Sequence, residues 1–386
     1  MEESNRAKRI KIFLGWLRIS IISLLAIFII ILVFVNKNQI SVDNFKRLLA
    51  RFDFTFGTSS NISTITFSAD DSNAFSVFKN GLSVISAEGL KIYDGNGNEF
   101  TSIQTVYKSP SIQTSKKFVL SYDRGGKVLN ISNSFTALFN KTFDDRIINA
   151  CINDNGYLAA ITETSGYKHM INVFNSNFNE VSKLYFSDRY IVNCAISQDN
   201  SSIAIISLAT EESSVNTLLS VYKIGAEKPL FEIKIEDDIA FEIQYKNGSN
   251  IEIISQKKAY YYSKTGTLLN TVDFIGGMLD LYTLSNSSTA FICRGISNEY
   301  LSHVIVTDEK GNKLAESPIE ENIIDCTFCD NNIALLSENS VGIYKTQRNE
   351  LVKVKDIKLD ETVNRILGNG NSVFLISKTH AVATKI

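Results

Sequence analysis

Short apolar stretches separated by polar turns recur along most of the chain. Ile148 to Glu163 reads INACINDNGYLAAITE, Val192 to Ser207 reads VNCAISQDNSSIAIIS, and Ile324 to Glu338 reads IDCTFCDNNIALLSE. Two apolar runs joined by Asn, Asp, Gly or Ser are typical of a β-hairpin. A third apolar run and a second turn follow, as in INVFNSNFNEV at Ile171 to Val181. The pattern therefore predicts a repeated unit of four antiparallel strands.

The spacing of these units predicts a β-propeller. Repeats of about 40 residues that each hold four strands are typical of propeller blades. We therefore predict an all-β, eight-bladed β-propeller, and seven blades remain an alternative if the weak second unit is misread. The first strands of the eight units are expected near Phe75, Ile112, Ile148, Ile191, Ala240, Asp280, Ile323 and Val363.

The two ends of the repeat predict how the ring closes. The last unit supplies three strands, around Asn364 to Leu367, Ser372 to Ser377 and Ala381 to Lys385, and lacks a fourth. The alternating stretch STITFS, Ser63 to Ser68, precedes the first unit and belongs to none. Pairing this stretch with the third strand of the last unit would cover an open sheet edge. We expect it to serve as the missing fourth strand.

The first 35 residues predict a membrane anchor. The run from Ile19 to Val35 carries no charge and extends back to Ile12 if Arg18 reaches the interface. Since about 20 helical residues span a bilayer core, we expect a transmembrane helix over 12–35. The sequence NKNQISVDN follows it, without the small residues of a cleavage site, which favours an uncleaved anchor over a signal peptide.

Charge around this segment predicts its orientation. Five basic residues lie before or within the apolar run, against two acidic ones, so we expect a cytoplasmic tail over 1–11 and an extracellular propeller. Apolar residues at helical spacing between Val42 and Phe52 predict a juxtamembrane helix and linker over 36–62. The propeller is expected over 63–386.

The overall charge argues against a nucleic-acid partner. The chain has a net charge of -2, and removing its basic first 36 residues leaves a more acidic domain. Nucleic-acid binding needs a basic surface, so the expected partners are the membrane and an envelope protein or cell-wall polymer.

Acidic residues gather in one class of connection. The links from a fourth strand to the next first strand, and from a second to a third strand, emerge on the same propeller face. Acids outnumber bases in these links, and a ring of one sign can focus an electric field. Solvation of loops is the simpler explanation of the pattern. The candidate partner-binding residues on this face are Asp144, Asp145, Asp188, Asp237, Asp238, Glu320, Glu321, Asp360 and Glu361.

The five cysteines are interpreted as small buried side chains. Cys151, Cys194 and Cys326 stand at matching places in first strands, which indicates a shared packing role. A disulfide between blades is not expected, because it requires Cα atoms within about 7 Å of each other. Cys326 and Cys329 have the spacing of a metal or redox pair, but no second pair accompanies them.

Other motifs have simpler structural interpretations. DGNGNE, Asp94 to Glu99, resembles the start of a calcium loop but lacks Gly at its sixth place and a carboxylate at its twelfth, which favours a turn. AYYY, Ala259 to Tyr262, offers rings that could stack on sugars, although packing between blades is the simpler role. No hydrolase, metalloprotease or phosphate-binding motif occurs. We predict no catalytic, cofactor or metal residues and no enzyme activity.

A basic tail, one anchor and a degenerate propeller, in a sequence rich in Ile, Asn, Lys and Ser, resemble a family. This is an uncharacterised clostridial group of single-pass membrane proteins with an extracellular WD40-like or YVTN-like propeller, classed as a domain of unknown function. The resemblance covers the full length and implies a cell-envelope protein of a Gram-positive anaerobe, without implying any chemistry. The only tryptophan is Trp16, so the Trp-Asp signature of typical WD40 repeats is absent.

Two functions are therefore compared. The first is a non-catalytic interaction or scaffold module that binds an envelope component through a loop face. The alternative is a small-ligand receptor or hydrolytic enzyme that uses the central channel. A channel lined by Cys, Ile and Ala favours the first function, and a cluster of carboxylates or histidines favours the second.

Overall fold

The computed structural model describes residues 64–386 except 212, 213, 248, 275, 277, 296 and 297, and before them only Trp16, Ser20, Ser23 and Leu24. Apart from those four residues, the expected anchor over 12–35 lies outside the described part of the chain. The expected helix and linker over 36–62 lie outside it as well. In the described part, no helix has the length and apolar character needed to cross a membrane. Met1–Phe52 and Asp53–Ile386 form separate units, and the account below concerns the second.

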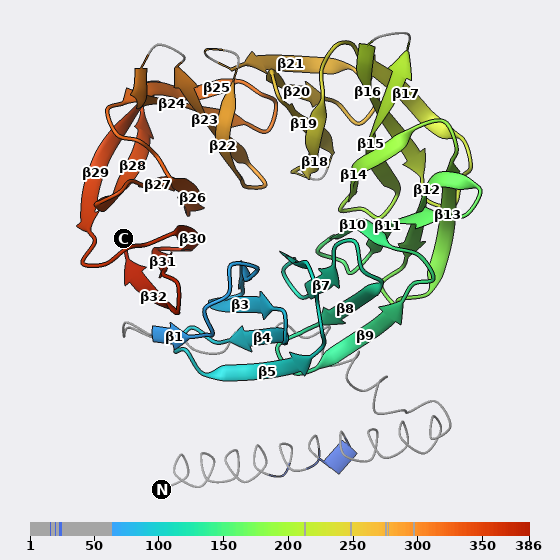
Figure 1. Ribbon diagram of the computed structural model, residues 1–386, viewed down its shortest axis with the longest axis horizontal. Coiled ribbons are helices and arrows are strands. Elements are labelled where there is room, and N and C mark those ends of the chain that lie inside the picture. The colour runs from blue at the N-terminus through green and yellow to red at the C-terminus, as the bar shows by residue number, and fades with distance from the viewer. Residues whose placement is uncertain are drawn as a thin grey trace, which may run out of the picture. The chain divides into compact units, whose positions relative to one another are not determined.

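The second unit contains eight four-stranded antiparallel sheets arranged in a ring (Figure 1). This confirms the prediction of an eight-bladed β-propeller. Blades 1 to 4 contain β2 (Ala74–Phe78), β3 (Gly81–Ser86), β4 (Gly89–Tyr93), β5 (Glu99–Gln104), β6 (Pro110–Thr114), β7 (Val119–Asp123), β8 (Val128–Ser132), β9 (Ala137–Thr142), β10 (Ile147–Ile152), β11 (Leu158–Thr164), β12 (Tyr167–Phe174), β13 (Glu180–Phe186), β14 (Tyr190–Ile196), β15 (Ser202–Glu211), β16 (Ser214–Lys223) and β17 (Pro229–Ile235).

Blades 5 to 8 follow the same order, and β1 completes the last of them. Their strands are β18 (Ala240–Lys246), β19 (Asn250–Ser255), β20 (Lys258–Tyr262), β21 (Leu268–Asp273), β22 (Leu279–Leu284), β23 (Ser288–Gly295), β24 (Asn298–Asp308), β25 (Lys313–Ile319), β26 (Asp325–Cys329), β27 (Asn332–Leu336), β28 (Ser340–Gln347), β29 (Glu350–Lys358), β30 (Arg365–Asn369), β31 (Ser372–Ile376), β32 (His380–Lys385) and β1 (Thr64–Thr66).

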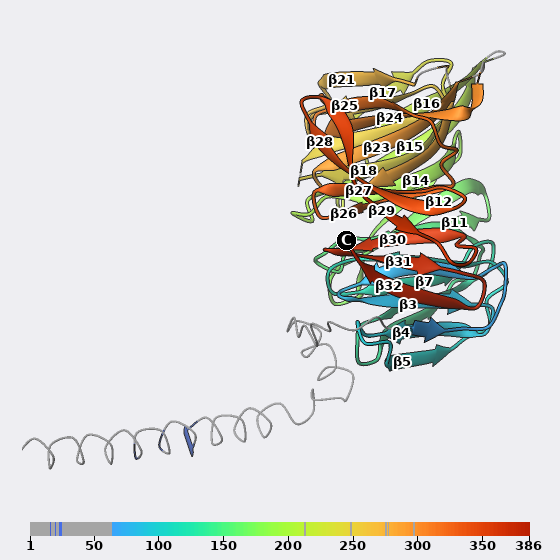
Figure 2. The same ribbon diagram turned by 90° about the vertical axis from the view of Figure 1, so that its left-hand side faces the viewer.

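The first strand of each blade lies toward the centre of the ring, and the fourth strand lies at its rim (Figure 1). Viewed from the side, the sheets stand across the thickness of the ring, so neighbouring sheets pack face to face (Figure 2). Side chains of a strand point alternately toward the two neighbouring blades, which explains why second strands such as β11 are apolar on both faces. In β11, for example, Leu158 to Ile161 are all completely buried.

The interface between blades 3 and 4 illustrates the core. Ile161, Ile171 and Val173 of blade 3 pack against Ile203 and Ile205 of blade 4, and all five are at most 1% exposed. Burying one such side chain contributes about 1.5–3 kcal/mol, and each blade repeats this packing with the next.

The ring closes between the two ends of the propeller. β1 pairs antiparallel with β32, with Thr64, Ile65 and Thr66 opposite Val382, Ala381 and His380. Ile65 is 1% exposed and packs in a cluster with residues of blades 8 and 1. This confirms that STITFS supplies the fourth strand of the last blade.

The direction of β1 is that of a fourth strand. Phe67 N, just after β1, donates to Thr379 O in the connection from the second to the third strand of blade 8. β1 therefore ends at the face that holds those connections and begins at the opposite face.

Polar side chains cap many of the turns between third and fourth strands. Asp94 Oδ1 accepts hydrogen bonds from the N–H groups of Asn96 and Asn98, and Asp308 does the same for Lys310 and Asn312. Asp94 belongs to DGNGNE, which is therefore a turn stabilised by its own side chains, as predicted.

A buried polar network joins blades 5 and 6. Lys246 Nζ of β18 lies 3.3 Å from Glu252 Oε2 of β19, and both side chains are fully buried. The same ammonium donates to Ser285 O, Ser288 O and Thr289 Oγ1 of blade 6. Tyr261 OH donates to Glu252 Oε1, so the carboxylate has partners on both oxygens.

Candidate functional site

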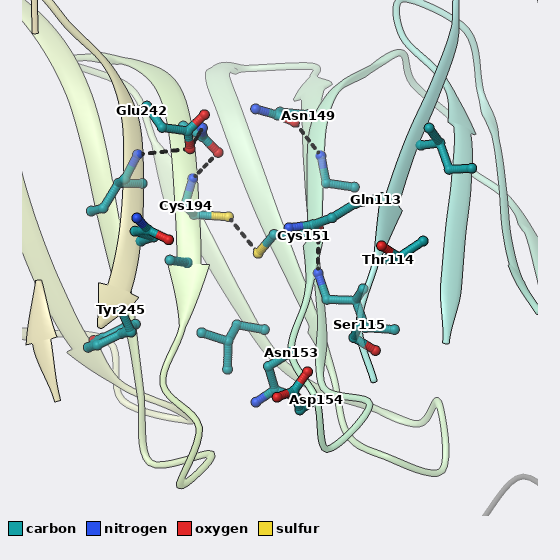
Figure 3. Close-up of a pocket in the computed structure, with 18 of the residues that line it drawn as sticks. Gln113, Thr114, Ser115, Asn149, Cys151, Asn153, Asp154, Cys194, Glu242 and Tyr245 are labelled. Carbon is teal, nitrogen blue, oxygen red and sulfur yellow. Dashed lines mark hydrogen bonds between the residues drawn. The ribbon is translucent and has the colours of Figure 1, made fainter. Parts of the chain in front are cut away.

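A cavity of about 630 Å³ lies on the inner side of blades 2 to 6. Its wall comes mainly from the first strands β6, β10, β14 and β18, with Tyr282 of β22 completing it (Figure 3). The volume lies within the range of small-molecule sites. The first strands bring their side chains here because they are the innermost strands of the blades.

A β-bulge near the start of β10, β14 and β18 places a polar side chain on the wall. The registers of β10, β14 and β18 shift just before Asn149, Asn193 and Glu242. Each of these side chains accepts a hydrogen bond from the N–H of its own following residue, at 2.8–3.0 Å. The bulge changes the direction in which the following side chains point. The polar side chain accepts a hydrogen bond from the backbone N–H that the irregular strand pairing leaves without a partner.

These side chains and two tyrosines form two hydrogen-bonded groups, which together we call the channel belt: Tyr122 with Asn149, and Asn193 with Glu242 and Tyr282. Tyr122 OH donates to Asn149 Oδ1 at 2.7 Å. Asn193 Nδ2 donates to Glu242 Oε1 at 3.1 Å, and Tyr282 OH donates to Glu242 Oε2 at 3.2 Å. Burial raises the pKa of Glu242 above its ordinary value, although the three donors oppose that shift.

The belt escaped the sequence analysis because its members are separated by about one blade each. A weak signal exists in the sequence: a polar residue interrupts the apolar run at the third place of IIN, IVN and AFE, which start at Ile147, Ile191 and Ala240. Only the closed ring shows that these three places face one cavity.

Charged groups on the cavity wall are few and separated. The carboxylates are Asp154, in the turn after β10, and Glu242, near the start of β18, so they approach the cavity from opposite faces. Asp154 forms an ion pair with Lys116 at 3.2 Å. No histidine lines the described wall, and the described residues hold no group of three or more His, Cys, Asp or Glu placed for a metal ion.

The five cysteines are buried and carry free thiols, as expected for packing residues. Cys151 Sγ lies 3.6 Å from Cys194 Sγ in the neighbouring blade, and the two thiols are not bonded. One detail of that expectation is wrong. The positions of Cys151 and Cys194 do not match, because Cys194 directly follows the bulge residue Asn193, whereas Cys151 is the second residue after Asn149.

The predicted acidic residues lie in the connections between blades. Hydrogen bonds from Lys116 N to Asp154 Oδ1 and from Asn153 Nδ2 to Ser197 O join the first turns of blades 2, 3 and 4 on one face. The connections from fourth to first strands are at the other ends of the strands, on the opposite face, which we call the loop face. It carries Asp144, Asp145, Asp188, Asp237, Glu320, Glu321, Asp360 and Glu361 as exposed or half-buried side chains.

Several of these acids have positively charged neighbours. Asp188 forms a bidentate contact with Arg189, and Glu321 lies 3.1 Å from Lys353 Nζ. Glu361 lies 2.7 Å from Nε2 of the imidazole of His380. Lysines near the starts of third strands, such as Lys168, donate to carbonyls of the loop face. In the described part of the chain no ion pair involves Asp144, Asp145, Asp237, Glu320 or Asp360.

Asp238 differs from the other predicted residues because it is only 2% exposed. Its Oδ2 accepts hydrogen bonds from Ser255 Oγ and Tyr260 OH, and its Oδ1 accepts one from the N–H of Ile239. Asp238 therefore stabilises the start of blade 5 and presents no carboxylate to a partner. Nothing in the sequence distinguishes it from its exposed neighbour Asp237.

The tyrosines of AYYY have packing roles. Tyr261 is completely buried in the network around Glu252, and Tyr262 packs in the core between blades 4 and 5. Burial raises the pKa of Tyr262 to about 12. Tyr260 is half-buried and donates to Asp238, so none of the three rings is offered as a free stacking platform.

Comparison with known families assigns the propeller. Residues 53–385 match the model of a family of unknown function, DUF5711. The chain belongs to this family. The DUF5711 match spans the eight blades described above and begins after the expected anchor. No curated protein matches the sequence.

Solved structures that resemble the chain include a WD40 domain. The C-terminal WD40 domain of Sif2 shares 10% identity with a TM-score of 0.59, over 84% of this chain and 95% of that one. A structure of a eukaryotic initiation factor shares 12% identity with a TM-score of 0.56, over 82% and 90% of the two chains. At such identities the likeness concerns the fold alone, and the protein is a WD40-like propeller.

Proposed function

We propose that this WD40-like propeller is a non-catalytic interaction module, held at the outer side of a cell membrane by residues 12–35. The partner is a protein or a cell-wall polymer of the envelope that carries positive charge. The observation that carries the proposal is the placement of Asp144, Asp237, Glu320 and Asp360 as exposed carboxylates around one loop face. Carboxylates on a rigid ring attract a basic partner at long range.

The direction of β1 supports a particular orientation. β1 begins on the face opposite the loop face. We propose that the loop face points away from the membrane, where it avoids anionic lipid headgroups.

The composition of the channel supports binding over catalysis. Cys151, Ile152, Cys194 and Ala195 form part of its wall, while its two carboxylates enter from opposite faces. General acid–base catalysis needs titratable groups that converge on one reacting atom.

A small-ligand receptor is the second candidate, favoured by the volume of the cavity and by the channel belt. Asn149, Asn193 and Glu242 place amide and carboxylate groups on one wall, where a ligand with several hydrogen-bonding groups could be held. A hydrolytic enzyme has less support, because the carboxylates are apart.

Proximity labelling in the native cell tests the interaction module. A labelling enzyme is fused after Ile386, and the loop face is neutralised with Glu320→Gln and Asp360→Asn. The matched control is Glu227→Gln with Asp330→Asn, which removes two exposed carboxylates from the opposite face. We expect one envelope component to be labelled by the wild type and the control, and to be lost from the loop-face variant.

The purified pair should also dissociate as salt is added, because exposed charges are screened within about 10 Å at 0.1 M. Equal labelling by the loop-face variant and the control would contradict the role of the loop face. Loss of labelling only on Glu242→Gln would favour the channel instead.

A further inference from the structure

Two thiols of neighbouring blades meet at the wall of the central cavity. Cys151 Sγ on β10 and Cys194 Sγ on β14 are 3.6 Å apart, and the two sulfurs point toward each other (Figure 3). A disulfide has an S–S distance of about 2.05 Å, so the sulfurs need to approach by about 1.5 Å to bond. Rotation of the two side chains and an approach of the strands would have to supply that difference.

The registers of the two strands explain why the thiols face each other. Cys151 lies opposite Ala159 in blade 3, and Cys194 lies opposite Ile205 in blade 4. Counted from Asn149 and Asn193, the two cysteines differ by one place, so the pleat directs them to opposite sides of their sheets. One side of blade 3 and the facing side of blade 4 form the interface, and both thiols belong to its core.

Cys326, the third cysteine on a first strand, shows that the contact between two thiols is specific to the interface of blades 3 and 4. Cys326 directly follows Asp325, as Cys194 follows Asn193. The place in blade 6 that corresponds to Cys151 is Thr283, which lies opposite Ala290. Of these two equivalent interfaces, only the one between blades 3 and 4 supplies a thiol from each side.

We propose that Cys151 and Cys194 form a reversible disulfide that ties blade 3 to blade 4 at the central cavity. The oxidant is a small-molecule disulfide that reaches the thiols through this cavity, whose wall includes both residues. Cys151 is 7% exposed and Cys194 is 2% exposed, so Cys151 is the thiol that reacts first.

The reaction proceeds by two exchanges. Cys151 loses its proton, and its thiolate attacks one sulfur of the small disulfide, which releases one small thiolate that takes up a proton. Cys194 then loses its proton and attacks the Cys151 sulfur of the mixed disulfide, which releases the second small thiol. Two protein thiols are oxidised, and one small disulfide is reduced to two thiols.

The environment of Cys194 fits the second role. Its contact with Cys151 and its burial hold the pKa of Cys194 well above the usual value, which disfavours its thiolate and leaves the more exposed Cys151 to react first. The finished bond would close a loop between residues 43 apart in sequence and fix the spacing of β10 and β14. Those strands also carry Asn149 and Asn193, so oxidation would make the wall of the cavity more rigid.

The test uses the purified full chain in detergent with oxidised glutathione as the probe. After incubation at increasing ratios of oxidised to reduced glutathione, free thiols are alkylated and the digested protein is analysed by mass spectrometry. We expect a cross-linked peptide pair that contains Cys151 and Cys194, which disappears on reduction. Closing this loop should raise the thermal unfolding midpoint by about 5 °C.

Variants distinguish the thiol that reacts first from the thiol that completes the disulfide. Cys194→Ser should accumulate glutathione on Cys151, because no second thiol can complete the exchange. Cys326→Ser is the matched control and should keep the cross-link, since it removes another buried thiol from an equivalent position. The proposal is overturned if the wild-type chain keeps both thiols alkylatable, or collects stable glutathione adducts, under conditions that fully oxidise an exposed dithiol peptide. The wild-type result decides this even if a variant fails to fold.

Discussion

Lys246 Nζ lies 3.3 Å from Glu252 Oε2 at a place where neither side chain contacts solvent. Its other hydrogen bonds reach carbonyls and a hydroxyl of blade 6, so a charge in blade 5 helps to hold the next blade. Burial lowers the pKa of Lys246, and the neighbouring carboxylate opposes that shift. The ammonium therefore depends on Glu252 to remain charged.

Glu252→Gln should lower the free energy of unfolding by about 3–5 kcal/mol, because it leaves a buried ammonium without its counter-charge. Urea unfolding at neutral pH measures the change. Glu180→Ala is the control, since Glu180 pairs with Lys183 on the surface, and it should cost at most about 1 kcal/mol. Lys246→Met combined with Glu252→Gln should cost less than Glu252→Gln alone. A larger cost for the double variant would show that the ammonium does not depend on Glu252.

Ile65→Ala should open the ring at its closing blade. Ile65 is 1% exposed in the cluster between blades 8 and 1, and removing a buried Ile side chain to Cβ typically costs about 2–5 kcal/mol. Hydrogen exchange should increase in β32, which loses part of its edge partner. Thr64→Ala on the same strand is the control, because Thr64 is exposed. Equal exchange of β32 in both variants would argue against closure by β1.

Acid should weaken the contact between blades 3 and 4 through His169. Its Nδ1 accepts the N–H of Ile191 at 2.8 Å, which requires a neutral ring, and burial lowers its pKa below the ordinary 6.5. The unfolded chain therefore binds the proton more readily. The stability from His169 is present above about pH 6.5 and is lost as the pH falls through the lowered folded pKa.

Urea unfolding of the wild type and of His169→Gln between pH 5 and pH 7.5 checks this sign. The Gln side chain can accept the same N–H without titrating, so the difference between the two proteins should shift in favour of the variant as the pH falls. A difference that stays constant across the range would contradict the assignment.

Glu242 should have the opposite pH dependence. Burial raises its folded pKa above the ordinary 4.5, so the folded protein binds this proton more readily than the unfolded chain. Its contribution is most favourable below pH 4.5 and falls as the pH rises through the raised folded pKa. The Glu242→Gln variant does not lose stability in this way, so its free energy of unfolding relative to the wild type should rise with pH. Chemical unfolding at several pH values above 4.5 measures this difference. A difference that falls as the pH rises would contradict the raised pKa.

The sequence by itself determined the blades and the closure. Strand alternation and turn chemistry act over a few residues, so the hairpins around Asn153 and Ser197 and the turn at Asp94 could be predicted without the fold. The closure followed as well, because STITFS and the three-stranded last unit each leave a sheet edge that needs a partner.

The tertiary structure alone decided which side chains meet. One bulge before Asn193 and another before Asn149 set the side of the sheet on which each following residue lies, and a shift of one residue moves a side chain to the other side. For this reason Cys151 and Cys194 appear equivalent in the sequence but face each other in the ring. The side chain of Asp238 is buried beside the exposed Asp237, and Lys246 contacts Glu252 and blade 6. These contacts could not be predicted, because they depend on the packing of neighbouring sheets rather than on local sequence.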